Sequence, residues 1–138
     1  VREVFSESKS VNASVLCYPV ISAEETTAHM GSFINLLGHE PETQEEIDYF
    51  SCDKQVREIT PPAFIWHTAE DGCVPVANSL LYAKALTEKG VPVELHIYPF
   101  GGHGLSTCDK HTIDDMTPVF SYNSVWLKSL KEWFKLIF

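Results

Sequence analysis

The chain has 138 residues, of which 44% are hydrophobic and 12% aromatic, and it carries a formal charge of −9. This length fits one domain with a hydrophobic core, and the composition excludes a disordered chain. The acidic balance argues against a nucleic-acid partner, which would need a basic face, and no apolar run reaches the roughly 20 residues of a membrane helix.

The first residue and the cysteines indicate how the chain is processed and in which compartment it lies. It begins with Val1 and lacks the pattern of a signal peptide, so we expect a processed chain or a fragment. The four cysteines are scattered along the sequence and form no CxxC pair: Cys17, Cys52, Cys73 and Cys108. They are typical of reduced thiols, and we expect a cytoplasmic protein.

Three short segments have strand character. Residues 14–18 and 63–68 are almost continuously apolar, as expected for parallel strands that are covered on both faces. Residues 93–98 alternate between apolar and polar side chains, which predicts a half-exposed strand near a sheet edge. Residues 1–12 are polar and irregular and are interpreted as a connecting tail, with the domain itself spanning 13–138.

Helical patterns follow the second and third strands. Residues 76–89 place four side chains near one face, namely Val76, Leu80, Ala83 and Leu86, and Gly90 is suited to cap that helix. Residues from about 123 to the end form a second stripe of Trp126, Leu130, Trp133 and Ile137. The alternation of strands and helices predicts an α/β protein with three layers, α/β/α.

The segment 22–60 does not fit a simple crossover between two strands. It contains a short acidic helix candidate at 40–50, with Pro41 suited to its first turn. Its polar character predicts an excursion over the rim of the sheet, which could form a lid or a pocket wall. A plain surface insertion explains the same composition at least as well.

Two loops carry the residues with the strongest chemical interest. AEDGCVP (69–75) follows the second strand, and PFGGHGLS (99–106) follows the third. Since ligands and catalytic groups collect at the carboxyl ends of parallel strands, Asp71 and His103 are expected at the same rim. A carboxylate there can accept the Nδ1–H of the imidazole and stabilise the imidazolium form. The glycines let the loop turn tightly around the histidine.

Ordinary structural interpretations of both loops remain open at this point. Asp71 and Gly72 would serve well in a turn, and a Gly-Gly-His-Gly segment is often a surface turn with an incidental histidine. Glu70 competes with Asp71 as the acid because it lies next to it. The order of acid, then histidine, at the ends of successive strands favours catalysis over these alternatives.

The stretch from PPAFIWHTAEDGCVP through VELHIYPFGGHGLS (61–106) resembles the C-terminal half of an α/β-hydrolase. It is most similar to the bacterial esterase/lipase group that includes acetyl-xylan esterases and relatives of dienelactone hydrolase. The blocks VLCYPVIS, HMGSFINLLG and FSCDKQV fit the same group, so the likeness runs from about residue 13 to 106. The pairing of DxxVP with GGHG is fairly specific for the superfamily and much less so for the substrate.

The resemblance implies a carboxylic-ester hydrolase that uses a Ser-His-Asp mechanism, with Asp71 as the acid and His103 as the base. Acetylated sugars or short acyl esters are the implied substrates, and no cofactor or metal is implied. Among the other histidines, His67 is interpreted as a strand residue and His96 as solvent-facing. His29 and His39 are placed at the surface, although the border of a pocket is an alternative.

The third member of the triad is missing from the sequence. No GxSxG elbow occurs anywhere in the chain, and by resemblance it would lie upstream of Val1. Cys17 and Cys73 are interpreted as structural rather than as substitutes for the serine. The strand at 14–18 would then lack its neighbour, so we expect either an oligomer or partner polypeptide, such as the missing N-terminal half, along that edge.

Two other functions fit the same sequence. The missing GxSxG is consistent with a truncated or pseudoenzyme module that acts only by association. The chain also resembles the end of a serine peptidase of the prolyl oligopeptidase type.

Overall fold

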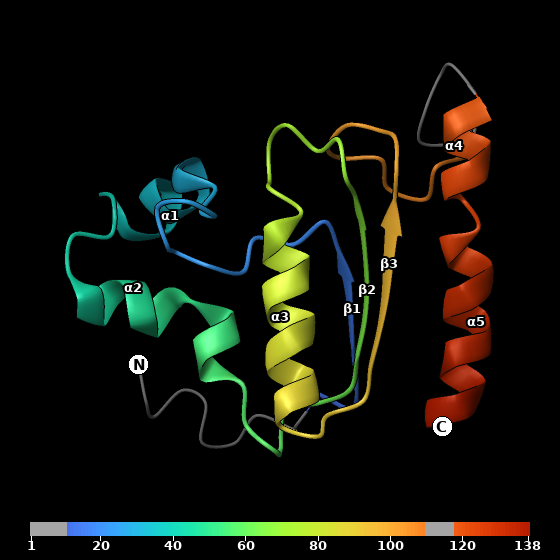
Figure 1. The fold of residues 1–138 in the computed structure, drawn as a ribbon, viewed down its shortest axis with the longest axis horizontal. Coiled ribbons are helices and arrows are strands. Elements are labelled where there is room, and N and C mark those ends of the chain that lie inside the picture. Colours follow the sequence, from blue (N-terminus) through green and yellow to red (C-terminus); the bar gives the residue numbers. More distant parts are fainter. Residues whose placement is uncertain (1–10, 110–117) are drawn as a thin grey trace.

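The computed structural model describes residues 11–109 and 118–138. Three parallel strands form one sheet in the order β1-β2-β3, with β1 at Ser14–Cys17, β2 at Ala63–Thr68 and β3 at Val93–Tyr98. In the register, Ser14 lies opposite Ala63, which lies opposite Val93, and Thr68 lies opposite Tyr98. The carboxyl ends of β2 and β3 therefore reach the same rim (Figure 1).

Helices cover both faces of this sheet. On one side lies α3 (Ala77–Glu88), and on the other lie α4 (Pro118–Asn123) and α5 (Trp126–Ile137), as Figure 1 shows. This arrangement confirms the predicted three-layer α/β/α architecture with three strands.

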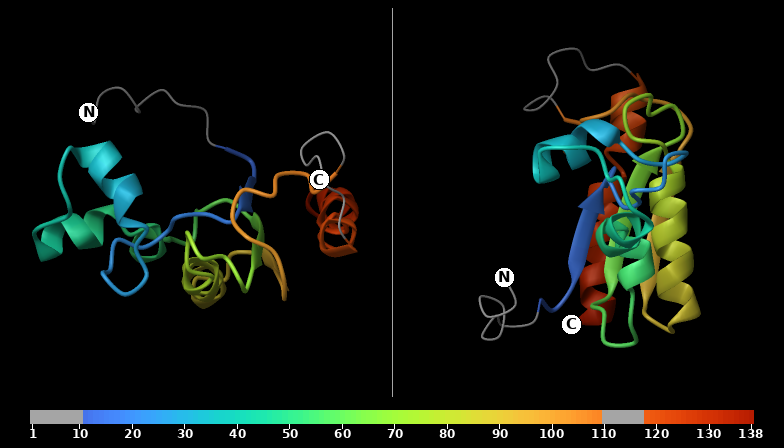
Figure 2. Two further views of the ribbon diagram at one scale, coloured as in Figure 1. Left: turned by 90° about the horizontal axis from the view of Figure 1, so that it is seen from above. Right: turned by 90° about the vertical axis from the view of Figure 1, so that its left-hand side faces the viewer.

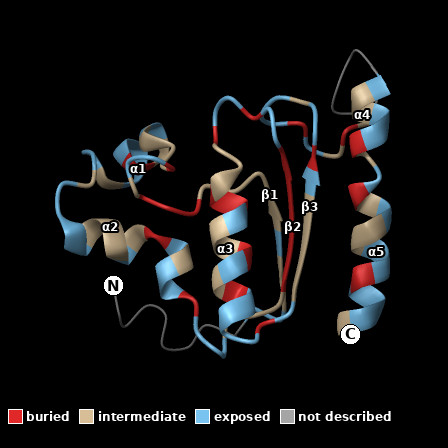
Figure 3. Ribbon diagram, viewed as in Figure 1, coloured by how far each residue is buried: buried red, intermediate tan, exposed pale blue. Residues whose placement is uncertain are grey.

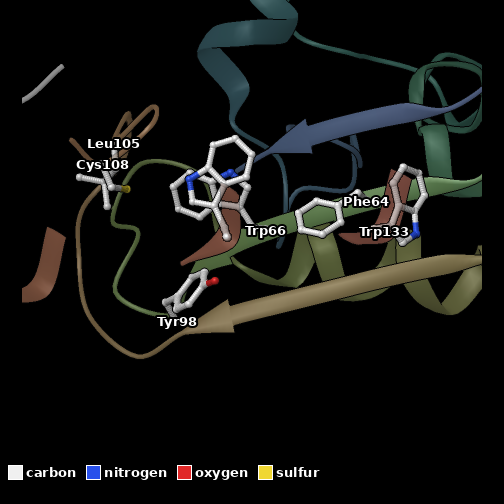
Figure 4. Close-up of a cluster of buried hydrophobic side chains, with 7 residues drawn as sticks. Phe64, Trp66, Tyr98, Leu105, Cys108 and Trp133 are labelled. Carbon is white, nitrogen blue, oxygen red and sulfur yellow. The ribbon is translucent and has the colours of Figure 1, made fainter. Parts of the chain in front are cut away.

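The central strand β2 is buried along its whole length (Figure 3), as its continuous apolar sequence predicts. Its alternate side chains divide the core in two. Phe64 and Trp66 join an aromatic cluster beneath α5 that also contains Tyr98, Leu105, Cys108, Trp126 and Trp133 (Figure 4). Ala63 and Ile65 point to the opposite face and pack with Val56, Ala83, Leu86 and Val91.

The end of α3 follows the predicted capping pattern. Gly90 has a positive φ of 70°, and its N–H donates to the carbonyl of Thr87, while the N–H of Val91 donates to the carbonyl of Leu86. These two bonds form a Schellman motif, which glycine favours because it has no Cβ. The predicted apolar face is wrong at Leu80, which is 51% exposed. The polar side chains of Asn78 and Ser79 are buried instead because each has hydrogen-bond partners in the interior.

The C-terminal helix is confirmed, and Trp126 and Trp133 are its buried residues. The predicted start at about residue 123 falls at the end of α4, a separate short helix that the sequence interpretation missed.

Most of the segment 22–60 folds beside α3 (Figures 1 and 2), while Val56 near its end belongs to the buried cluster that contains Ala63 and Ile65 of β2. The segment contains α1 (Met30–Leu37), α2 (Gln44–Phe50) and a 3-10 turn at Cys52–Gln55. The helix α1 was not predicted, and Pro41 does not lie in the first turn of α2. That helix begins later because Thr43 and Glu46 form a capping box at its start. Whether the segment acts as a lid stays a prediction.

The strand β1 is only partly covered, which differs from the expectation of two buried faces. It pairs with β2 alone among the described residues, and Val15 is 37% exposed. Its other edge is unpaired in this part of the chain. The predicted tail at 1–12 lies almost wholly outside the described residues.

Candidate active site

The candidate site lies at the rim where β2 and β3 end. The segment 69–75, the acid loop, leaves β2, and the segment 99–106, the base loop, leaves β3. The N–H of Ala69 donates to the carbonyl of Tyr98 at 2.8 Å, which ties the start of the acid loop to the end of β3. The two loops are therefore held side by side, as the sequence predicts.

Asp71 is the buried anchor of the site, and its side chain is fully shielded from solvent. Its Oδ1 accepts the backbone N–H groups of Cys73 and Val74, each at 2.9 Å. Its Oδ2 lies 2.8 Å from Nδ1 of His103. Burial alone raises the pKa of the Asp71 carboxyl, but the hydrogen bonds from Val74, His103 and Cys73 outweigh it, and the pKa lies below its ordinary value of 3.8.

His103 stands partly in solvent, with its side chain 34% exposed. An ionised carboxylate can only accept hydrogen bonds, so Nδ1 of His103 carries the proton that faces Asp71. In the neutral ring this leaves Nε2 as the basic nitrogen. A partly exposed imidazole held by a buried carboxylate is an arrangement suited to general-base chemistry.

The base loop is fixed through Gly101, which adopts a positive φ of 120°. A Cβ at this position would come within 2.8 Å of Cδ1 of Leu105 and 3.0 Å of Nδ2 of Asn123. The carbonyl of Gly101 accepts the hydroxyl of Thr68 at 2.7 Å, and the carbonyl of Phe100 accepts Nδ2 of Asn123 at 2.9 Å. Glycine is required at this position because the positive φ disfavours any other residue and because there is no room for a Cβ.

Tyr18 is a site residue that the sequence interpretation missed. It follows β1 with a positive φ of 41°, which is unusual for a residue other than glycine. Its ring meets that of His103 edge to face, with centroids 4.8 Å apart, and its hydroxyl accepts the N–H of Ser106 at 3.1 Å. Tyr18 therefore supports the base loop from the neighbouring strand.

His67 is the second residue that was missed, although its place in a strand was predicted. Its ring is fully buried, and Nε2 lies 3.1 Å from Oδ2 of Asp71 and 3.0 Å from the carbonyl of Val74. Its Nδ1 lies 2.8 Å from the hydroxyl of Ser79 on α3. Burial is the largest influence on the pKa of His67 and lowers it below the ordinary value of 6.5.

The competing acid, Glu70, is hydrogen-bonded to the base loop at Gly101 rather than at His103. Glu70 is exposed, and its carboxylate accepts the N–H of Gly101 at 3.3 Å. The hydrogen bond to His103 is made by Asp71, so the geometry distinguishes the two adjacent carboxylates.

The other three histidines considered in the sequence lie outside the Asp71–His103 pair. His96 is only partly exposed, since its ring lies against Phe64, and its Nε2 is 2.7 Å from Glu94. His39 is exposed. His29 is half-buried and its Nε2 lies 3.5 Å from Sγ of Cys73, so it borders the acid loop.

Neither cysteine considered as a nucleophile is hydrogen-bonded to the base. Across residues 11–109 and 118–138, no serine or cysteine side chain is hydrogen-bonded to His103. Cys17 is half-buried at the end of β1, and burial raises the pKa of its thiol, which disfavours the thiolate. Cys73 is exposed on the acid loop, and its Sγ faces Nε2 of His29 rather than His103.

Two further features concern the described parts of the chain, a cluster of metal-ligating side chains and a membrane-spanning helix. These residues contain no cluster of three or more His, Cys, Asp or Glu side chains that could hold a metal ion. None of the helices among them has the length and apolar character that crossing a membrane requires.

Several known proteins are similar to this chain. An endo-1,4-beta-xylanase B of Butyrivibrio fibrisolvens is 50% identical over 95 residues, which are 69% of this chain and 15% of that protein. An acetylxylan esterase of Xylanibacter ruminicola is 36% identical over 129 residues, or 91% of this chain and 25% of that protein.

Among solved structures, an acetyl ester-xyloside bifunctional hydrolase of Caldicellulosiruptor lactoaceticus superimposes with a TM-score of 0.78 at 44% identity. The match covers 91% of this chain and 42% of that one. The chain thus spans a quarter or less of the curated relatives and under half of this structure. Its residues 13–129 match the prolyl oligopeptidase family, and with the three-layer architecture shown above the chain belongs to that family and forms part of an α/β-hydrolase domain.

Proposed function

We propose that this chain supplies the acid and the base of a carboxylic-ester hydrolase, with Asp71 orienting His103. One observation carries the proposal: the 2.8 Å hydrogen bond between a fully buried carboxylate and a partly exposed imidazole at the rim of the sheet. The nucleophilic serine and the donors to the oxyanion are supplied by polypeptide outside this sequence, which contains no GxSxG.

In the proposed reaction, Nε2 of His103 takes the proton from the serine hydroxyl as its oxygen attacks the ester carbonyl. The tetrahedral intermediate collapses to an acyl-enzyme, and the imidazolium returns the proton to the leaving alcohol. Water then repeats the sequence and releases the acid. Asp71 stays ionised throughout and stabilises the charged imidazole, a role that its lowered pKa supports.

The proposed substrate is a small acetyl ester on a sugar. Support comes from the names of two relatives, an acetylxylan esterase and an acetyl ester-xyloside hydrolase. A peptide substrate is the second candidate, because the matched family is described as prolyl oligopeptidase. Acyl transfer from an ester and from an amide uses the same acid and base, so the two candidates differ in the substrate pocket.

The edge of β1 is the proposed contact with the rest of the catalytic unit. β1 pairs on one side only within the described residues, and an open parallel edge exposes N–H and C=O groups that another strand can pair with. We propose that an upstream half, or failing that a second copy of the chain, pairs there. Light scattering of the purified chain tests this, and a stable monomer with no bound polypeptide would contradict it.

We also propose a cytoplasmic location, which the four unpaired cysteines support. Fractionation of the source cells followed by mass spectrometry of this chain would test it, and recovery from an extracellular fraction would contradict it.

The experiment that tests the function is a chimera. The upstream part of the Caldicellulosiruptor lactoaceticus hydrolase is joined to this chain in place of its own matching segment, since the two superimpose with a TM-score of 0.78. Hydrolysis of p-nitrophenyl acetate, acetylated xylo-oligosaccharides and a prolyl p-nitroanilide is then measured.

The chimera should cleave the acetyl esters, and His103→Ala should lower kcat by at least about 100-fold because the general base is lost. Asp71→Asn should also impair kcat, while Glu70→Gln is the matched control and should leave the rate nearly unchanged. A folded chimera whose rate does not depend on His103 would contradict the proposal. Faster cleavage of the anilide than of the esters would instead favour the peptidase.

A further inference from the structure

We propose that His67 is a positioning residue which, as a neutral imidazole protonated on Nε2, holds Oδ2 of Asp71 toward His103. The inference rests on the proposed function and adds a third member to its acid–base pair. Its basis is one oxygen atom with two imidazole partners: Oδ2 of Asp71 lies 3.1 Å from Nε2 of His67 and 2.8 Å from Nδ1 of His103.

The neighbours of the ring determine which nitrogen carries the proton. Nε2 faces two groups that only accept hydrogen bonds, the carbonyl of Val74 and the carboxylate of Asp71, so it must be the donor. Nδ1 faces the hydroxyl of Ser79, which can donate. The Nε2–H form is therefore the neutral tautomer in which every contact is satisfied.

His67 supplies an anchor for Asp71 that the acid loop cannot supply. The backbone of Cys73 and Val74 fixes Oδ1 from within that loop. Without His67, Oδ2 would be held only by His103, which is the residue that it must itself position. The imidazole of His67 is rigid because it is buried in the central strand, and its bond to Ser79 links it to α3.

A neutral His67 also preserves the charge balance of the site. A second cation beside Asp71 would compete with the imidazolium of His103 for the same carboxylate. Among the described residues, the titratable groups that act on His67 are Asp71 in direct contact and His103 beyond it; Ser79 and the Val74 carbonyl do not titrate in this range. Burial opposes protonation, consistent with the lowered pKa of this ring.

The first test is the tautomer of each histidine in the intact chain labelled with ¹⁵N-histidine. Long-range ¹H–¹⁵N spectra distinguish protonated from unprotonated ring nitrogens. We expect His67 to be neutral with its proton on Nε2 at neutral pH, and the neutral form of His103 to favour Nδ1–H. A charged His67, or a His67 with its proton on Nδ1, would overturn the inference.

The second test compares two substitutions at this position. His67→Gln places an amide N–H close to the position of Nε2, whereas His67→Phe keeps an aromatic ring and removes the donor. We expect His103 to lose its Nδ1–H preference in H67F and to retain it in H67Q. An unchanged His103 tautomer in a folded H67F chain would overturn the inference, and if H67F fails to fold, loss of the preference in H67Q would do so.

Asp71→Asn separates this inference from the function on which it rests. The amide of asparagine can donate to Nδ1, so His103 should shift to the Nε2–H tautomer whatever His67 does. If D71N leaves His103 unchanged, the acid–base pair itself is wrong and both proposals fail. If D71N shifts His103 and H67F does not, only the positioning role of His67 is overturned.

Discussion

The two faces of β2 are built on different physical principles. Toward α5 the strand presents Phe64 and Trp66 to a cluster of aromatic side chains, where Trp66 stacks on Trp126 with ring centroids 5.3 Å apart. Toward α3 it presents the aliphatic side chains of Ala63 and Ile65 and then His67, whose ring is hydrogen-bonded to Ser79 and Asp71. The first face stabilises the fold through non-directional burial, whereas the second specifies the position of individual atoms. The candidate site is attached to the second.

The largest expected effect is the loss of stability on disrupting the aromatic face of β2. Trp66→Ala should lower the free energy of unfolding by about 4 kcal/mol, because it removes a fully buried indole and leaves a cavity. Trp66→Phe should cost less. Urea denaturation measures both, and Tyr49→Ala, at a side chain that is 67% exposed, is the control with little expected change. A Trp66→Ala loss no larger than that of the control would contradict this assignment of the core.

A smaller effect is expected in the base loop. Gly101→Ala should cost about 3 kcal/mol, since the new Cβ meets Leu105 and Asn123 at a positive φ. Gly102→Ala is a matched control, because a Cβ added there would meet nothing within 4 Å and its φ is not positive. Equal unfolding free energies for the two variants would show that the loop adopts another conformation.

A substitution at Asn78 tests the hydrogen-bonded side of the molecule, toward α3. Its Oδ1 accepts the N–H groups of Ile21 and Ser22, at 2.8 and 2.9 Å, and its Nδ2 donates to the carbonyl of Thr27. Asn78→Ala leaves these buried groups unpaired and should cost about 2 kcal/mol. Amide hydrogen exchange should accelerate at Ile21 and Ser22, and the exposed Asn35→Ala is the control. Unchanged exchange at both amides would show that the carboxamide does not hold this segment.

The smallest effect is a dependence of stability on pH that comes from His67. Its folded pKa lies below the ordinary value of 6.5, so below that pH the unfolded chain binds more protons than the folded one. The free energy of unfolding should therefore fall as the pH drops through 6.5 toward the folded value, and His67→Gln should reduce this slope.

Denaturation curves from about pH 8 to about pH 5 measure the slope in the range where histidine titrates. This window lies above that of Asp71, whose lowered pKa contributes stability that is lost only as the pH falls below 3.8. A slope in the His67→Gln chain as steep as in the unchanged chain would contradict the buried neutral state of His67.

The sequence predicted the features that depend on local pattern. The three strands, the stripe of Trp126 and Trp133, and the approach of Asp71 to His103 follow from apolar periodicity and from parallel strands ending at one rim. The DxxVP motif favoured Asp71 over Glu70 as the partner of the histidine. The structure gives a physical reason, because the buried carboxylate of Asp71 is the one that contacts His103.

The missed features depend on partners that are distant in the sequence. Ser106 and Tyr18 are 88 positions apart, so no local pattern could link the base loop to β1. Asn78 and Ser79 were not among the side chains of the predicted apolar face of α3, and only their tertiary hydrogen bonds explain why they are buried while Leu80 is exposed. His67 was interpreted only as a strand residue; its place in a buried strand, four positions before a carboxylate, is the one sequence signal that could have identified its role.

The central claim is that this chain holds an acid and a base whose nucleophile lies elsewhere. The most direct measurement is the intact mass of the chain and of the chimera after exposure to a fluorophosphonate that traps activated serines. We predict no adduct on the folded 138-residue chain and one adduct on the chimera, formed far more slowly after His103→Ala. A single adduct on the chain alone that His103→Ala abolishes would contradict the account, because the chain would then contain its own activated nucleophile.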